Sequence, residues 1–295
     1  MVFRLESVVD LSTGEARSPM TLQDNPLTRM TATFSAEDLR RAFLVTGMFR
    51  PGETNLRWWE TDRTVMGAVI PVAEALPLTN PPSLKCAFFL ERREAGLINL
   101  GGPGAVVVDG KAFAMEPCDA LYIGRGAREV SFESRSVTNP ARFWMMSYPA
   151  HVAYPARHVA FAGVSGERLG SHESSNERTL FRLIHPATVP TCQLVMGFTR
   201  MEPGSVWNSM PPHTHLRRSE VYLYFNLPPG QAVFHVMGEP SSTRHLLVHD
   251  CEAVLSPPWS VHCGAGTTAY SFVWCMGGEN QEFSDMDAAP VAELR

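Results

Sequence analysis

The stretch MPPHTHLRRSEVYLYFNL, residues 210–227, decides the fold and contains the pattern H-x-H-x4-E in His213, His215 and Glu220. Side chains at positions i and i+2 of a β-strand share one face, so both imidazoles can reach the same ion. Glu220 lies five positions beyond His215 and would occupy the opposite face of a continuous strand. We therefore expect a turn at residues 216–219 and a hairpin that returns the carboxylate to the histidines. Such a donor set suits a first-row divalent metal with open positions.

A third histidine completes the pattern downstream. His262 follows a proline turn at residues 257–258, roughly forty residues after Glu220. The order H-x-H-x4-E and then P-x4-H resembles the metal-binding pattern of the cupin barrels. The predicted metal ligands are His213, His215, Glu220 and His262.

Length, composition and charge narrow the class of protein. The chain has 295 residues, of which 44% are hydrophobic and 19% charged, and this predicts a soluble globular protein with one large or two moderate domains. The formal net charge of -5 and the absence of a basic stripe in the sequence argue against a nucleic-acid partner. The sequence contains no transmembrane-length apolar run and no signal-peptide segment, so we expect no membrane partner and a cytoplasmic location.

The pattern along the chain predicts an all-β protein with a few short helices. Residues 1–34 carry few patterned apolar positions and are expected to form an N-terminal arm. Ser35 as N-cap, with Asp38 three residues later, predicts a helix that continues through residues 39–45. Short apolar or alternating runs separated by Gly and Pro then predict the strands of a sandwich or barrel. These runs are 64–72, 87–90, 96–100, 105–108, 120–123, 129–132, 192–199, 220–225, 232–237, 245–248, 253–255 and 270–276.

An internal repeat predicts two copies of one β-barrel. NLGGPGAVVVDG at 99–110 resembles NLPPGQAVFHVMG at 226–238, and DALYIG at 119–124 resembles EAVLSP at 252–257. Two copies of an all-β unit imply a bicupin, which consists of two jelly-roll barrels.

The same repeat suggests how the chain divides. We expect an N-terminal barrel over residues 35–150, a Gly-, Pro- and Ser-rich linker over 151–180 and a C-terminal barrel over 181–295. Glu129 falls at the repeat position of His262, and the first copy contains no H-x-H. Only the C-terminal barrel is therefore expected to bind a metal.

Several longer motifs resemble one family, the 5-keto-4-deoxyuronate isomerases, also called 4-deoxy-L-threo-5-hexosulose-uronate ketol-isomerases. The likeness runs from about Asp38 to Arg295. The matching stretches are FFLERREAGLINLGGPG (88–104), DALYIGRGAREV (119–130), TCQLVMG (191–197), WNSMPPHTHLRRSEVYLYFNL (207–227), SPPWSVHCGAGTTAYSFVW (256–274) and GENQEFSDMD (278–287).

This resemblance implies a bicupin that is a homohexamer with one Zn²⁺ per subunit. It implies a ketol-isomerase that converts 5-dehydro-4-deoxy-D-glucuronate, which is 4-deoxy-L-threo-5-hexosulose uronate, to 3-deoxy-D-glycero-2,5-hexodiulosonate in the degradation of pectin and related uronates. The zinc ligands of the family carry over to His213, His215, Glu220 and His262.

The chemistry of such a carbonyl shift requires a group that takes a proton from one carbon and returns it to the next. Glu220 is the candidate catalytic residue, and another Glu or His beside the ion is equally possible. Arg178 is a candidate for binding the substrate carboxylate, and Tyr222 and Trp207 are candidate walls of the cavity. The motif at residues 91–94 fits either a subunit contact or catalysis.

Two other classes fit parts of the same pattern. A metal-dependent cupin dioxygenase would use iron with the same ligand set and consume oxygen. A non-enzymatic sugar-binding or storage bicupin is disfavoured, because storage cupins have typically lost the histidines that are present here.

Overall fold

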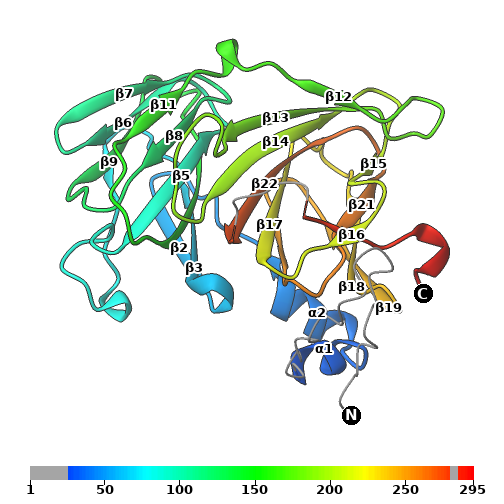
Figure 1. Cartoon of the computed structure of the whole chain (residues 1–295). Helices are drawn as coiled ribbons and strands as arrows, with labels where there is room; N and C mark the ends of the chain where they lie inside the picture. Colours follow the sequence, from blue (N-terminus) through cyan, green and yellow to red (C-terminus); the bar gives the residue numbers. More distant parts are fainter. Residues whose placement is uncertain (1–25, 280–284) are drawn as a thin grey trace, which may run out of the picture.

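Residues 26–279 and 285–295 are described in the computed structural model of the chain. They form two antiparallel β-barrels side by side, one mainly from residues 54–159 and the other mainly from residues 167–288 (Figure 1). The predicted all-β bicupin with a few short helices is confirmed. No helix in the described ranges is long and apolar enough to cross a membrane.

The N-terminal barrel consists of two facing sheets. The larger sheet has the strand order β11-β8-β5-β10-β3-β2, and the smaller has the order β4-β9-β6-β7. Their bounds are β2 (Thr54–Trp59), β3 (Thr64–Val69), β4 (Leu76–Pro77), β5 (Arg93–Asn99), β6 (Gly104–Val108), β7 (Lys111–Met115), β8 (Ala120–Ile123), β9 (Val130–Ser134), β10 (Phe143–Pro149) and β11 (Arg157–Val159).

The C-terminal barrel has a sheet of order β1-β20-β17-β22-β14-β13-β12, a sheet of order β15-β21-β18-β19 and the pair β16-β23. Their bounds are β1 (Leu44–Val45), β12 (Glu167–Leu169), β13 (Arg178–Ile184), β14 (Val195–Met201), β15 (Trp207–Asn208), β16 (His213–Thr214), β17 (Arg218–Phe225), β18 (Val233–Glu239), β19 (Ser242–Val248), β20 (Ala253–Ser256), β21 (Cys263–Gly266), β22 (Ser271–Gly278) and β23 (Asp287–Ala288). The 3-10 helices are η1 (Thr61–Arg63), η2 (Pro82–Leu84), η3 (Phe161–Gly163) and η4 (Val291–Glu293).

The topology repeats as the sequence predicts. The order β8-β5-β10-β3-β2 in the first barrel matches the order β20-β17-β22-β14-β13 in the second. The predicted repeat partners 119–124 and 252–257 contain the equivalent strands β8 and β20. Strand β17, which carries Glu220, therefore corresponds to β5 of the first barrel.

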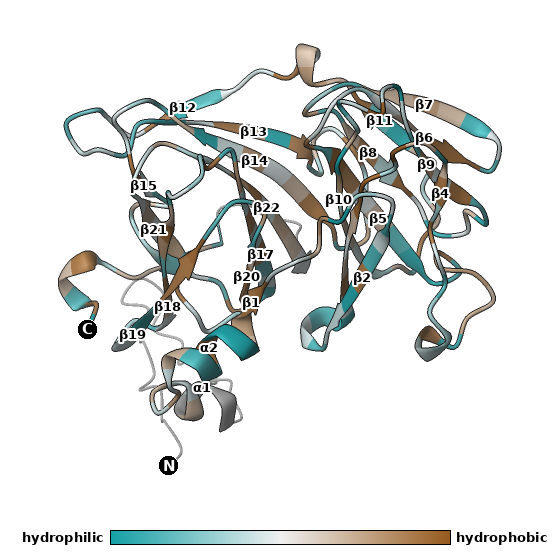
Figure 2. Cartoon of the chain, turned by 180° about the vertical axis from the view of Figure 1, so that it is seen from behind, coloured by the Kyte–Doolittle hydropathy of each residue, from teal (hydrophilic) through white to brown (hydrophobic). Residues whose placement is uncertain are grey.

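The large sheets pack against each other and bury both of their faces. In β10, Phe143 and Met145 join the core inside the N-terminal barrel, whereas Trp144 and Met146 join a second core shared with the C-terminal barrel. Alternate side chains point to opposite faces of a strand, so each sheet contributes to two apolar layers. Apolar residues accordingly dominate the strands between the barrels (Figure 2).

The N-terminal segment packs on the C-terminal barrel, which corrects the predicted boundaries. Helix α1 (Pro26–Thr31) lies within the predicted arm, and residues 1–25 lie outside the described residues. Helix α2 (Ala36–Phe43) has the predicted capping box of Ser35 and Asp38. The chain leaves the helix at Leu44, because Leu44–Val45 pair with β20 as an edge strand. Residues 36–45 thus belong with the C-terminal barrel, and the predicted start of the N-terminal barrel at residue 35 is too early.

The predicted linker and one predicted strand also differ from the structure. Within residues 151–180, β11 pairs with β8 of the N-terminal barrel, and β12 pairs with β13 of the C-terminal barrel. Residues 87–90 form a turn instead of a strand, with the backbone N–H of Ala87 bonded to the carboxylate of Glu91. The burial of Phe89 and Leu90 in that turn accounts for its apolar character.

Candidate metal centre

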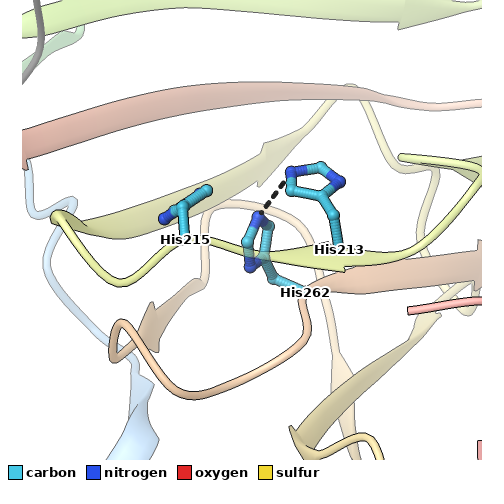
Figure 3. A group of neighbouring side chains, drawn as sticks. All are labelled: His213, His215 and His262. Carbon is cyan, nitrogen blue, oxygen red and sulfur yellow. Dashed lines mark hydrogen bonds between the residues drawn. The ribbon is translucent and has the colours of Figure 1, made fainter. Parts of the chain in front are cut away.

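Three histidines and a glutamate meet in the C-terminal barrel. The Nε2 atom of His262 lies 3.2 Å from Nε2 of His213 and 3.1 Å from Oε2 of Glu220. The Nε2 atom of His215 lies 3.0 Å from the same oxygen of Glu220. Figure 3 shows the three imidazoles turned toward one another, and their ligand atoms all lie within 4.8 Å. The structure therefore brings together the four side chains named from the sequence.

The turn between His215 and Glu220 exists, but the predicted hairpin does not form. β16, which begins with His213, pairs with β23 near the C-terminus. β17, which carries Glu220, is hydrogen-bonded to β20 on one edge and to β22 on the other. Because both edges of β17 are occupied, β16 must find another partner, and the side chains alone bring the ligands together.

Backbone carbonyls orient all three imidazoles. The Nδ1 atom of His215 lies 2.9 Å from the carbonyl oxygen of Arg218, and that of His262 lies 3.2 Å from that of Ser260. His213 makes a looser contact of 3.5 Å with the carbonyl oxygen of Pro211. A carbonyl can only accept, so we assign the proton of each neutral ring to Nδ1 and a lone pair to Nε2.

This assignment places three imidazole lone pairs and a carboxylate oxygen against one another with no proton between them. Such groups repel at the contacts of 3.0–3.2 Å seen here. A cation among them reverses the sign of every one of these interactions. A tetrahedral ion with bonds of about 2.1 Å separates its ligand atoms by about 3.4 Å. Carbonyls that orient metal-binding histidines are the usual outer contacts of such sites.

Burial and charge favour the ligating protonation states. Burial lowers the pKa of His213 to about 3, with a further contribution from the neighbouring His262. Burial alone would raise the pKa of Glu220, and only positive charge or N–H donors on the imidazoles of His262 and His215 would bring it below its usual range. His213 therefore remains neutral near pH 7, and a cation held among the ligand atoms would keep Glu220 ionised.

A cavity of about 330 Å³ is lined by three of the four candidate ligands, His213, His215 and Glu220. Its wall is largely apolar, with Leu180, Phe272 and Met286 among its residues. Polar groups reach it from Arg178 and from Tyr222, whose hydroxyl lies 2.8 Å from the hydroxyl oxygen of Ser209. The volume suits a small molecule that contacts the metal ligands at one point and polar side chains at others.

The predicted substrate-binding residues lie at different places. Arg178 and Tyr222 line the cavity, whereas Trp207 lies in β15, paired with β21, and is absent from the residues that line it. The role predicted for Trp207 stays a prediction. Tyr224 lies deeper in the barrel, with its hydroxyl 2.8 Å from Nδ1 of His235, and that buried histidine is a core residue.

Several residues of the site were missed or misread from the sequence. Arg218, which lies in the segment expected to form an exposed turn, is 2% exposed, lines the cavity and forms an ion pair with Asp285. Its place two positions before Glu220 on one strand was the available indication, because i and i+2 share a face. Ser209 lies outside any regular alternation, so no pattern marked it.

Glu94, in the charged motif at residues 91–94, forms hydrogen bonds between the two barrels. The buried carboxylate of Glu94 accepts hydrogen bonds from the backbone N–H groups of Cys192, Gln193 and Leu194, at 2.7–2.9 Å. These N–H groups lie directly before β14 of the other barrel. Glu94 therefore joins the two barrels of one chain.

The N-terminal barrel contains no comparable cluster among the described residues. Glu129, which occupies the repeat position of His262, is exposed and has its backbone N–H bonded to Asp109. In the described parts of the chain, three or more His, Cys, Asp or Glu side chains come close enough to share a metal ion at one place, which is formed by His213, His215 and His262.

The fold and the site together define a bicupin whose C-terminal barrel has a centre that could hold a metal ion. The chain belongs to the KduI/IolB family, whose model matches residues 47–291. It is 49% identical over 261 residues to the 4-deoxy-L-threo-5-hexosulose-uronate ketol-isomerase of Kineococcus radiotolerans, covering 88% of this chain and 94% of that one. It is 48% identical over 277 residues to the enzyme of the same name from Opitutus terrae, covering 94% and 100%. The predicted family and the predicted enzyme class, an isomerase, are thereby confirmed.

Solved structures support the fold. An IolB-like protein from Salmonella typhimurium superposes with a TM-score of 0.69 at 17% identity, covering 83% of this chain and 96% of that one. The oxalate decarboxylase of Bacillus subtilis superposes with a TM-score of 0.53 at 12% identity, covering 82% and 80%. At these identities the likeness concerns the fold alone.

Proposed function

We propose that this chain is a zinc-dependent aldose–ketose isomerase acting on 4-deoxy-L-threo-5-hexosulose uronate, to give 3-deoxy-D-glycero-2,5-hexodiulosonate. The observation that carries the proposal is the set of three inward lone pairs and one carboxylate beside a cavity of about 330 Å³. Relatives that are 48–49% identical over most of the chain bear the name of this ketol-isomerase.

The donor set fits one Zn²⁺ per subunit, held by His213, His215, Glu220 and His262. Zinc is bound by imidazole nitrogen and carboxylate oxygen, and both are offered here at contacts of 3.0–3.2 Å between ligand atoms. When bound, the ion supplies a Lewis acid that polarises the substrate carbonyl. The N-terminal barrel is proposed to bind no metal.

The residues of the chain move the proton. Glu220 is proposed as the base that takes a proton from the hydroxyl-bearing carbon and returns it to the neighbouring carbonyl carbon, while the proton of the hydroxyl group passes to the former carbonyl oxygen. A cation held beside this carboxylate would favour its ionised form. The hydroxyl of Tyr222, supported by Ser209, lies in the same cavity and can donate a hydrogen bond to a substrate oxygen. The apolar wall excludes water from the reacting atoms.

The assembly is proposed to be a homohexamer. Several large apolar side chains are exposed on the single chain, among them Trp58, Phe234 and Leu247. Phe234 and Leu247 are opposite each other in the register of β18 and β19 and form one patch. Contact between subunits would remove such a patch from water. Light scattering at micromolar concentration measures the mass, and a monomer would contradict this part of the proposal. A cytoplasmic location stays a prediction.

The test is an isomerase assay with defined metals. The protein is stripped with a chelator, reloaded with Zn²⁺ or with Fe²⁺, and assayed for the carbonyl shift while an electrode follows oxygen. Isomerisation restored by Zn²⁺ without oxygen uptake is the expected result. Oxygen uptake with Fe²⁺ and no isomerisation would favour the cupin dioxygenase, and no turnover with either metal would favour a binding or storage bicupin.

A further inference from the structure

We infer that Arg178 binds the carboxylate of the ligand, so that the cavity selects sugar acids over neutral sugars of the same shape. The inference deepens the proposed function, since it rests on a uronate as the substrate. It concerns recognition and not turnover, so it can be tested apart from the isomerase activity.

Arg178 is held in place by the backbone. It begins β13, is 8% exposed and lines the same cavity as His213, His215 and Glu220. One terminal nitrogen donates to the carbonyl oxygen of Asn176 at 2.9 Å, and the other donates to that of Met210 at 3.2 Å. A guanidinium has five N–H donors in a rigid plane. Two of them position the group, and the others remain for a ligand in the cavity.

The charge of Arg178 also lacks a counter-ion among the described residues. The other arginine that lines the cavity, Arg218, is paired with Asp285, and the arginines Arg182 of β13 and Arg168 of β12 are paired with Glu167 and Glu177. No described carboxylate lies within 4.0 Å of the Arg178 guanidinium. Burial lowers the pKa of Arg178, and the groups that oppose this effect are the hydroxyls of Tyr222 and Tyr270, whose own pKa values are raised by burial, so that they are neutral near pH 7.

A buried cation without a counter-ion is costly, and a carboxylate ligand removes that cost. A planar guanidinium can donate two parallel hydrogen bonds to a carboxylate. A neutral amide offers one acceptor oxygen and no negative charge, so it cannot form the same pair. The rest of the wall is apolar, which strengthens the interaction by lowering the local dielectric constant.

The position of Arg178 links recognition to the metal ligands. Met210, whose carbonyl holds the guanidinium, lies three residues before His213 on the same loop. A uronate in the aldehyde form carries its carboxylate and its carbonyl at opposite ends of the chain. Arg178 and the metal ligands line one cavity and can hold these two ends together, which orients the reacting carbons.

The experiment compares a charged ligand with its neutral counterpart. Calorimetric titration of the metal-loaded protein with D-glucuronate and with D-glucuronamide gives a ratio of dissociation constants. We expect the native protein to bind the acid about 10- to 100-fold more tightly, the range of a charge-assisted bidentate contact. In Arg178→Gln this ratio is expected to approach one. The matched control is Arg168→Gln, which removes an exposed arginine from the neighbouring strand β12 and should leave the ratio unchanged.

The ratio separates recognition from loosening of the loop. Loss of the bond to Met210 would weaken both ligands alike, whereas loss of the charge weakens only the acid. Arg178→Lys provides a second variant, because it keeps the charge and loses the planar fork, and we expect an intermediate ratio. The inference is wrong if the native protein shows no preference for the acid, or if either variant at Arg178 keeps the native ratio.

The proposed function can fail independently. If the native protein does not isomerise the uronate but its preference for the acid disappears in Arg178→Gln, the proposed reaction is wrong and the assignment of Arg178 stands. If the native protein isomerises the uronate but the ratio of dissociation constants is the same in the Arg178 variants, the proposed reaction stands and the assignment of Arg178 is wrong.

Discussion

The carboxylate of Asp62, in the N-terminal barrel, accepts hydrogen bonds from both the backbone N–H and the hydroxyl of Ser219, in the C-terminal barrel. Ser219 directly precedes Glu220 and pairs in register with Gly277 of β22. A Cβ atom at Gly277 would lie 2.0 Å from the ring of Tyr148, so glycine permits this close approach of the barrels. The first barrel thus holds the backbone beside a metal ligand.

We predict that Asp62→Ala weakens metal binding as well as the fold. Two hydrogen bonds are lost and a part-buried N–H is left without its acceptor, at a cost of about 1–3 kcal/mol. Because the affected residue adjoins Glu220, we expect the metal dissociation constant to rise by about tenfold. Competition with a fluorescent chelator measures it.

Asp109→Ala is the matched control for Asp62→Ala. Asp109 also accepts two backbone N–H groups, those of Arg128 and Glu129, but it lies in an exposed part of the N-terminal barrel remote from the metal ligands. It should lower the free energy of unfolding without changing metal affinity. Equal metal affinities in the native protein and in Asp62→Ala would contradict the prediction.

Variants of the four ligands should behave in two ways. His215→Ala and His262→Ala remove buried imidazoles from the centre, so we expect metal content and turnover to fall together. Glu220→Gln keeps an oxygen that can face the ion but cannot accept a proton. If Glu220 is the base, this variant retains some metal and loses orders of magnitude in kcat, each tenfold being about 1.4 kcal/mol in the barrier.

Metal content and activity are measured on the same samples at saturating Zn²⁺. His245→Ala is the control, because His245 is an exposed histidine of β19 in the same barrel. If Glu220 is only a ligand, activity in Glu220→Gln will follow metal occupancy and return with excess metal. Full activity in a metal-free His→Ala variant would exclude the metal mechanism.

We predict that the buried His235 makes the free energy of unfolding depend on pH. Burial lowers the pKa of His235 from 6.5 to about 3. Between these values the unfolded chain binds a proton here that the folded chain does not, so the free energy of unfolding decreases as the pH falls through this window. One such proton contributes a slope of up to about 1.4 kcal/mol per pH unit.

His235→Gln removes the titrating group and can keep a bond to Tyr224. We expect its free energy of unfolding to fall less steeply between about pH 6.5 and pH 4 than that of the native protein. Urea unfolding of metal-free protein at several pH values measures the slope. The exposed His245 provides the control variant His245→Gln, which should keep the native slope. An unchanged slope in His235→Gln would contradict the assignment.

We predict that substitutions of Glu94 lower the free energy of unfolding but leave kcat of the folded protein unchanged. Glu94→Ala leaves three backbone N–H groups between the barrels without their acceptor, and we expect the free energy of unfolding to fall by about 3 kcal/mol or more. Glu94→Gln keeps one acceptor and should cost less. The control is Glu91→Gln, which alters a half-buried carboxylate that accepts one N–H, from Ala87. Denaturant unfolding measures the three variants, and a catalytic role would appear as lost kcat in protein that is still folded.

The sequence by itself determined the class of fold, the repeat and the four side chains that meet at the candidate metal centre. Period-2 alternation places Glu220 and Tyr222 on one face of β17, and the spacing of His213 and His215 places both rings on one side. The helix at residues 36–43 was readable because the cap of Ser35 and Asp38 is local in sequence. These features depend on neighbours a few residues apart, which the sequence displays directly.

Only the tertiary structure decided which distant segments meet. β16 pairs with β23 across more than seventy residues, and Leu44–Val45 extend the sheet of the second barrel instead of the first. The alternation of apolar and polar residues shows which side chains share a face of a strand. It does not show which strand pairs at the edge, because every non-proline residue offers the same backbone N–H and C=O groups. For that reason the counter-ion of Arg218, the unpaired charge of Arg178 and the support of Ser219 by Asp62 became visible only when the barrels were packed together.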